Sequence, residues 1–179
     1  RNANRPGDDP IFALNREATQ RRAAGEKVIN ATVGALLEDD GSLAVLPTVT
    51  EVLREVSPAK AAGYAPIAGV PEFLQEVTRD LLGGTSLAEQ CVSVSTPGGT
   101  GALRHAAAAF LDHDQSLITS SFYWGPYATI CDENERKLVT FPMFDDAGGF
   151  HVAAFARALD ETARAQGRLL VFLNDPCHN

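Results

Sequence analysis

The chain has 179 residues, of which 45% are hydrophobic and 21% are charged, and these proportions are typical of a folded domain. Its 15 Lys and Arg residues against 23 Asp and Glu residues give a formal net charge of −8, which argues against a nucleic-acid backbone or an anionic membrane as partner. The longest apolar run is far shorter than the about 20 residues that a membrane-spanning helix needs. This length allows one domain, or one domain and part of another.

Three cysteines, Cys91, Cys131 and Cys177, stand far apart in the chain. Their odd number, the lack of a CxxC pair and the lack of a signal peptide predict free thiols in a cytoplasmic protein. The histidines are isolated, so no metal site is expected. The chain begins without Met at Arg1 and stops abruptly at Asn179, so we expect both ends to be cuts within a longer protein.

The first half of the chain is predicted to be mainly helical. Pro and Gly bracket its amphipathic stretches, which predicts helices from Pro10 to about Gly25, over 47–62 and over 71–82. A short extended segment at 28–33 and a turn at 39–41 are predicted between the first two helices.

From Cys91 onward, short apolar runs alternate with helical patterns. The sequence predicts strands at 91–96, 117–120, 137–141 and 169–173, and helices at 102–111, 125–133 and 152–166. This alternation predicts an α/β fold in three α/β/α layers, with a mostly parallel sheet covered by helices on both faces. The helical start would then precede that domain.

The strongest local motif is the glycine-rich turn Thr96-Pro97-Gly98-Gly99-Thr100-Gly101-Ala102, between a predicted strand and a predicted helix. Glycines let backbone N–H groups approach a bound group, and a helix N-terminus carries about half a positive charge, so the turn suits a phosphate. The same glycines would also suit a tight turn without a ligand. Arg104 replaces the third glycine of a dinucleotide fingerprint, and no Gly-Lys pair exists for a P-loop, which leaves a small phosphate-bearing cofactor.

Aromatic and polar residues follow two later strands, at the ends where parallel sheets bind ligands. Trp124, the only tryptophan, stands in the segment 122–127 and would either stack on a planar ring or pack in the core. In the last six residues, Asn179 carries an amide that can donate to an anionic oxygen. Cys177 and His178 are adjacent and point opposite ways on an extended chain, which disfavours a metal or thiol–imidazole site there.

Together these motifs resemble the N-terminal half of a class I aminotransferase of the aspartate and aromatic type, a pyridoxal-phosphate enzyme of fold type I. Five segments in the same order carry the resemblance: Thr32-Val33-Gly34-Ala35 with Asp39-Asp40-Gly41, Gly63-Tyr64-Ala65-Pro66-Ile67-Ala68-Gly69, Gly98 to Arg104, Trp124-Gly125, and Cys177-His178-Asn179. The resemblance implies an N-terminal arm or small-domain segment over 1–45. It implies the first part of the large, cofactor-binding domain over 46–179, truncated at its C-terminal end.

The resemblance also implies pyridoxal 5'-phosphate as cofactor, with a role for each matching residue. The amides of Gly98, Gly99 and Thr100 would hold the phosphate. Trp124 would stack on the pyridine ring, and Asn179 would donate to the phenolic oxygen of that ring.

Further implied roles concern the substrate and a second subunit. Gly34, Trp124 and Asn179 would contact the substrate, and Tyr64 would reach the partner's phosphate in a homodimer. The reaction implied is amino transfer between an amino acid, of the aspartate or aromatic type, and a 2-oxo acid.

The sequence departs from the family pattern in two places and leaves one gap. Gly98 stands where the family usually has Ser, and Tyr127 where it often has His. The Schiff-base lysine of the family is expected beyond Asn179, so no catalytic residue is assigned within the chain. Alternative functions are a β-lyase-like enzyme of the same fold, a non-catalytic cofactor-binding effector domain of a regulator, and a scaffold that binds nothing.

Overall fold

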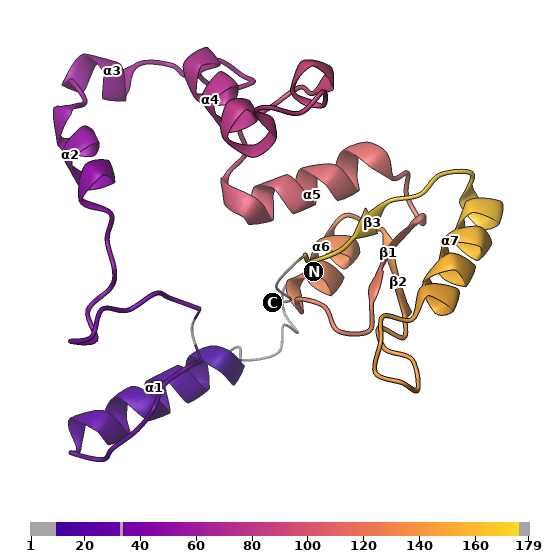
Figure 1. Cartoon of the computed structure of the whole chain (residues 1–179), viewed down its shortest axis with the longest axis horizontal. Coiled ribbons are helices and arrows are strands. Elements are labelled where there is room, and N and C mark those ends of the chain that lie inside the picture. The colour runs from indigo at the N-terminus through magenta and orange to yellow at the C-terminus, as the bar shows by residue number, and fades with distance from the viewer. Residues whose placement is uncertain (1–9, 33, 176–179) are drawn as a thin grey trace. The chain divides into compact units, whose positions relative to one another are not determined.

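The computed structural model describes residues 10–32 and 34–175 (Figure 1). The chain divides into two compact units, Arg1–Tyr64 and Ala65–Asn179, and each is described here by itself. Within the described ranges, no helix is both long and apolar enough to cross a membrane.

The first unit contains the helices α1 (Pro10–Ala23), α2 (Pro47–Glu55) and α3 (Pro58–Ala62). The single helix expected over 47–62 is wrong, because Pro58 ends the first part of it and begins the second. A proline lacks the backbone N–H and disfavours helical geometry at the residue before it. That residue, Ser57, instead caps α3 by accepting a hydrogen bond from the Lys60 amide at 3.2 Å.

Between α1 and α2 the chain forms the expected turn but no regular strand. Leu37 and Leu43 form an isolated antiparallel bridge around the turn at 39–41. The extended segment expected at 28–33 forms no strand over its described residues, 28–32. Instead, the Asn30 side chain donates to Asn15 Oδ1 of α1 at 2.8 Å.

The second unit holds the sheet and the helices around it. Its elements in chain order are α4 (Pro71–Leu82), a 3-10 turn (Ala88–Gln90), α5 (Gly98–Phe110), β1 (Ser116–Ser120), α6 (Pro126–Glu133), β2 (Lys137–Phe141), α7 (Val152–Gln166) and β3 (Val171–Phe172). The predicted bounds of α4, β2 and α7 are confirmed. The helix α5 begins earlier than expected, because the glycine-rich motif forms its first turn.

The three strands form a parallel sheet in the order β2-β1-β3. Ser116 of β1 pairs with Lys137 of β2, and Ile118 pairs with Val171 of β3. The helix α6 connects β1 to β2, and α7 connects β2 to β3. The expected α/β fold with parallel strands and helical crossovers is therefore confirmed.

Two core clusters cover the two faces of this sheet. Leu117 belongs to the cluster that contains Tyr127 and Cys131 of α6, whereas its neighbour Ile118 belongs to the cluster that contains Ala154 of α7. Leu117 and Ile118 are both 0% exposed, and burying such a side chain contributes about 2 to 3 kcal/mol. Figure 1 shows α6 and α7 on opposite sides of the strands, which gives the α/β/α layering.

The strand expected at 91–96 is wrong. This segment forms no strand, and its Ser95 amide donates to the Ala68 carbonyl at 2.7 Å, in a loop. Val92 and Val94 are 92% and 62% exposed, so their β-branched side chains do not face a core here. Such side chains favour a strand only where a neighbouring strand can pair with it.

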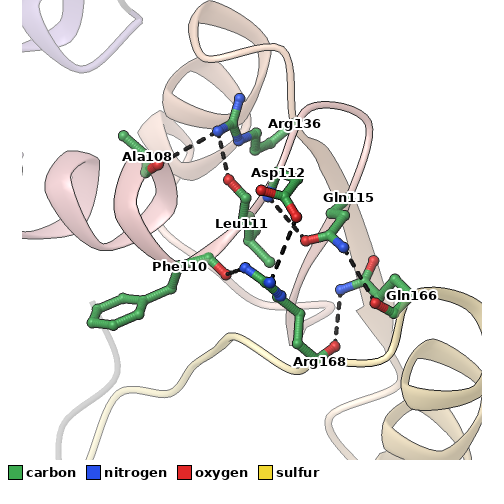
Figure 2. A network of polar contacts seen from close by, with 8 residues as sticks. All are labelled: Ala108, Phe110, Leu111, Asp112, Gln115, Arg136, Gln166 and Arg168. Atoms are coloured by element: carbon green, nitrogen blue, oxygen red, sulfur yellow. Dashed lines mark hydrogen bonds and ion pairs between the residues drawn. The ribbon is translucent and has the colours of Figure 1, made fainter.

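A polar network fixes the C-terminal end of α5 to the residues that precede β2 and β3 (Figure 2). Arg136 donates from Nη2 to the Leu111 carbonyl at 2.5 Å. Arg168 donates from Nη1 to the Phe110 carbonyl at 3.2 Å, and its Nη2 lies 3.6 Å from a carboxylate oxygen of Asp112. The last turn of α5 has no basic residue, so these arginines supply the donors and the positive charge that a helix C-terminus favours.

Gln166 at the end of α7 extends this network to the start of β1. Its side chain accepts from the Ser116 amide at 2.7 Å and donates to the Ser116 carbonyl at 3.0 Å. Gln115 in turn donates to the Gln166 carbonyl at 3.2 Å. Side-chain hydrogen bonds therefore stabilise the amino edge of the sheet. The carboxyl edge carries the loops that follow the strands.

Candidate active site

The glycine-rich turn leads directly into α5. The structure gives a different explanation for the glycine at each of its positions. Gly98 has φ +67°, a conformation that favours glycine. A Cβ on Gly101 would lie 2.7 Å from Pro97 Cδ, so packing requires glycine there too. A Cβ on Gly99 would meet nothing within 4 Å, and Gly99 has no positive φ. Neither packing nor backbone geometry explains Gly99, whereas close approach of a ligand would.

The first turn of α5 presents backbone donors. The Gly98 amide donates to the Thr96 carbonyl at 2.7 Å, and the Gly101 amide to the Pro97 carbonyl at 3.3 Å. Among the described residues, the amides of Gly99 and Thr100 have no such acceptor, and no side chain caps the helix. Unpaired N–H groups at a helix N-terminus attract anions. The amides of Gly99 and Thr100 are therefore available to an anion, whereas the Gly98 amide is already paired with the Thr96 carbonyl.

Gly69 supports the segment that enters this turn. It has φ +117°, and a Cβ placed on it would lie 2.2 Å from Ser95 Oγ. Only a glycine allows Ser95 to reach the Ala68 carbonyl this closely. The sequence motif that ends at Gly69 and the glycine-rich turn are therefore in contact through Ser95.

Trp124 lies in the turn between β1 and α6 and is half-buried. It packs against the core cluster of Leu117, Tyr127 and Phe172, which Leu103 in the second turn of α5 also contacts. The turn that carries the indole and the N-terminal half of α5 therefore share one core cluster.

Tyr127 forms an aromatic contact with the Trp124 indole. The two rings meet edge to face, with centroids 6.0 Å apart and an interplanar angle of 85°. The Tyr127 ring also meets Phe172 edge to face at 5.2 Å, and its hydroxyl donates to Asn174 Oδ1 at 3.0 Å. Tyr127 is 5% exposed, and this burial raises the pKa of its hydroxyl above the usual 10.0. The hydroxyl is therefore a protonated donor at neutral pH.

The other residues that the sequence predicted for the site lie elsewhere or outside the description. Gly34 and Tyr64 are exposed residues of the first unit. Asn179 lies outside the described residues, as do Cys177 and His178. The described part of the second unit brings together Leu103 of α5, the Trp124 turn and the end of β3 in one core cluster.

The lysines of the chain are exposed and lie away from these loops in sequence. Lys137 at the start of β2 forms an ion pair with Asp114, with 3.4 Å between Nζ and Oδ1. Lys27 and Lys60 belong to the first unit. In the residues that the structure describes, no three His, Cys, Asp or Glu side chains gather in a way that could hold a metal ion.

The sequence reasoning missed two contacts. The motifs give Tyr127 no role beyond replacing a histidine, and they do not predict its hydrogen bond to Asn174. The signal was present, because both residues follow strands that end at the same edge of a parallel sheet. The contact between Gly69 and Ser95 had no signal in the sequence, since it depends on how the loop over 91–96 folds against the residues that precede α4.

Comparison with known proteins gives a consistent result for most of the chain. Residues 26–179 match the family model for aminotransferase class I and II. The chain is 29% identical over 181 aligned residues to aspartate aminotransferase of Escherichia coli, covering 96% of this chain and 44% of that protein. It is 28% identical to mitochondrial aspartate aminotransferase of Schizosaccharomyces pombe, covering 78% of this chain and 32% of that protein.

Solved structures agree with this match. The structure of an aminotransferase from Anaerococcus prevotii superimposes with a TM-score of 0.88 at 34% identity, covering 98% of this chain and 43% of that one. The cytoplasmic aspartate aminotransferase of Saccharomyces cerevisiae gives a TM-score of 0.72 at 24% identity, covering 89% of this chain and 40% of that one, and shows the fold alone. The chain thus spans less than half the length of these similar proteins.

Proposed function

The chain belongs to the class I and II aminotransferases, and from this premise we propose that its protein transfers an amino group between an amino acid and a 2-oxo acid, with pyridoxal 5'-phosphate as cofactor. The observation that carries the proposal is the start of α5, where the amides of Gly99 and Thr100 have no acceptor among the described residues. No packing contact and no positive φ explain the glycine at position 99. A phosphate monoester has the charge and the acceptors that such a turn favours.

Each residue of the site would act on the cofactor through its own chemistry. Gly99 and Thr100 would donate backbone hydrogen bonds to the phosphate, and the Thr100 hydroxyl would add another donor. Gly98 would give the backbone its positive φ and would add its amide once released from Thr96. The cofactor, when bound, supplies an electron sink for removal of the Cα proton of an amino acid.

The aromatic part of the site would orient the ring. Trp124 would stack on the pyridine plane, which is worth about 0.5 to 1.5 kcal/mol beyond the area it buries. Asn179 would donate from its amide to the phenolic oxygen and, with Gly34, would contact the substrate. Tyr64 would complete the phosphate site of a partner subunit, so we propose a homodimer. The Schiff-base lysine would lie outside this chain.

The proposed substrate type and compartment rest on the names of similar proteins. Among them is the cytoplasmic aspartate aminotransferase of Gallus gallus, at 36% identity over 107 residues, covering 57% of this chain and 26% of that protein. We therefore propose a cytoplasmic enzyme that acts on an amino acid of the aspartate or aromatic type.

Amino transfer is tested on the full-length protein loaded with pyridoxal 5'-phosphate. Adding L-aspartate or L-phenylalanine should shift the visible absorption band of the cofactor and yield one equivalent of the matching 2-oxo acid. A second 2-oxo acid should then restore the band. Release of ammonia without such restoration would indicate a lyase, and an unchanged band with bound cofactor would indicate a non-catalytic domain.

The phosphate site is tested by a matched pair of variants. Thr100→Val removes a hydroxyl beside the proposed phosphate, whereas Thr129→Val removes an exposed hydroxyl on α6. We expect Thr100→Val to weaken pyridoxal 5'-phosphate binding about tenfold and to leave binding of pyridoxal unchanged. Equal affinity of the two variants for the phosphorylated cofactor would contradict the assigned role of Thr100.

A further inference from the structure

Two loops of the carboxyl edge are joined by one side-chain hydrogen bond. The Tyr127 hydroxyl, in the first turn of α6, donates to Asn174 Oδ1 just after β3, at 3.0 Å. The strands β1 and β3 are neighbours, so this bond connects the start of α6, which follows β1, to the loop that follows β3. The two residues are 47 positions apart in the sequence.

The ring of Tyr127 contacts residues next to both ends of this hydrogen bond. Its centroid is 6.0 Å from that of Trp124, edge to face, and 5.2 Å from that of Phe172 at the end of β3. The Tyr127 amide also donates to the Trp124 carbonyl at 2.9 Å. One residue therefore contacts the Trp124 indole by its ring and the Trp124 carbonyl by its amide, and it contacts Phe172 by its ring and Asn174 by its hydroxyl.

We propose that Tyr127 and Asn174 are positioning residues for the cofactor site: their hydrogen bond fixes the Trp124 turn relative to the chain that leaves β3. This inference rests on the proposed function, because it assigns the loops on either side of the bond to one cofactor. Through this bond, Tyr127 would set the position of Trp124, the proposed stacking partner of the cofactor ring. Tyr127 itself does not need to touch the cofactor.

The chemistry of the pair fits this role at neutral pH. The hydroxyl is protonated, since burial raises the pKa of Tyr127, and the amide oxygen of Asn174 is a neutral acceptor. The aromatic contacts of the ring are Tyr123, Trp124 and Phe172. The bond is therefore expected to persist across the physiological pH range.

The test compares two tyrosines of the same cluster. Tyr127→Phe removes the hydroxyl and keeps the ring, and Tyr123→Phe makes the same change in a ring that stacks on Tyr127 at 6.3 Å. Asn174→Ala removes the acceptor from the other side. The ligand is pyridoxamine 5'-phosphate, which cannot form imines with surface lysines, and its affinity for the full-length protein is measured by calorimetry.

We expect Tyr127→Phe and Asn174→Ala each to weaken binding of pyridoxamine 5'-phosphate about fivefold, the effect of losing one neutral hydrogen bond. The double variant should bind no more weakly than either single variant. Tyr123→Phe should bind like the wild type. Equal affinities for Tyr127→Phe and Tyr123→Phe, or losses that multiply in the double variant, would overturn the proposal.

A second measurement separates this proposal from the proposed function. Amide hydrogen exchange of residues 171–175 without any ligand should be faster in Tyr127→Phe and Asn174→Ala than in Tyr123→Phe. If the wild type fails to bind pyridoxamine 5'-phosphate, the proposed function is wrong. If the wild type binds and exchange over 171–175 is the same in all variants, only the positioning role is wrong.

Discussion

At the residue scale, the glycine-rich turn shows that glycines close in sequence can have unrelated causes. Gly98 is needed for its φ of +67°, and Gly101 because a Cβ would lie 2.7 Å from Pro97 Cδ. Gly99 has neither reason in this structure. The sequence predicts the turn and its suitability for an anion, but it cannot separate these causes, because they depend on backbone angles and neighbouring atoms.

This difference predicts opposite effects for two alanine substitutions. Gly99→Ala should leave the free energy of unfolding unchanged or raise it by up to about 1 kcal/mol, since alanine favours a helix. It should weaken binding of pyridoxamine 5'-phosphate about tenfold, because the new methyl group fills the space next to the free amides. Gly101→Ala should lower the free energy of unfolding by about 1 to 3 kcal/mol. Denaturant unfolding and calorimetry measure both, and a Gly99→Ala protein that binds like the wild type would contradict the role of Gly99.

Cys131 gives a pH-dependent prediction at the same scale. The thiol is 1% exposed, and burial raises its pKa from 9.0 to about 11. The unfolded chain then loses this proton at lower pH than the folded chain, so stability present below pH 9 is lost as the pH rises toward 11. We expect the free energy of unfolding to fall more steeply between pH 9 and 11 in the wild type than in Cys131→Ala. Equal slopes would contradict burial of this thiol.

At the element scale, periodicity predicted the elements that lie within the sheet and its crossovers. The bounds of β2 and α7 match their predicted ranges, because proline, glycine and apolar spacing mark their ends. The segment 91–96 has the same composition as a strand, but no neighbour pairs with it in the described structure. Pairing partners lie far away in sequence, so composition alone cannot show whether a strand forms.

The anchoring of α5 gives a prediction for this scale. Arg136 is half-buried and donates to the Leu111 carbonyl at the end of the helix, so Arg136→Met should lower the free energy of unfolding by about 2 kcal/mol. Arg168 is more exposed, and Arg168→Met should cost only about 0.5 kcal/mol. Arg157→Met, on the exposed face of α7, serves as the control. Denaturant unfolding measures all three, and equal stability of the Arg136 and Arg157 variants would contradict the anchoring role.

At the scale of the whole molecule, the order of the motifs predicted more than any single motif. The glycine-rich turn and the Trp124 turn are each weak signals, yet their order pointed to the class I and II aminotransferases, to which the chain belongs. The hydrogen bond between Tyr127 and Asn174 could not be predicted in the same way. It requires the neighbouring positions of β1 and β3, which the fold determines and the local sequence does not.

The central claim is that the start of α5 and Trp124 bind the two ends of one cofactor. A crystal structure of the full-length protein with pyridoxamine 5'-phosphate tests this most directly. We expect phosphate oxygens within about 3.2 Å of the Gly99 and Thr100 amide nitrogens. We also expect the indole of Trp124 in offset stacking over the pyridine ring. A phosphate bound elsewhere, or an indole that faces away from the ring, would contradict this claim.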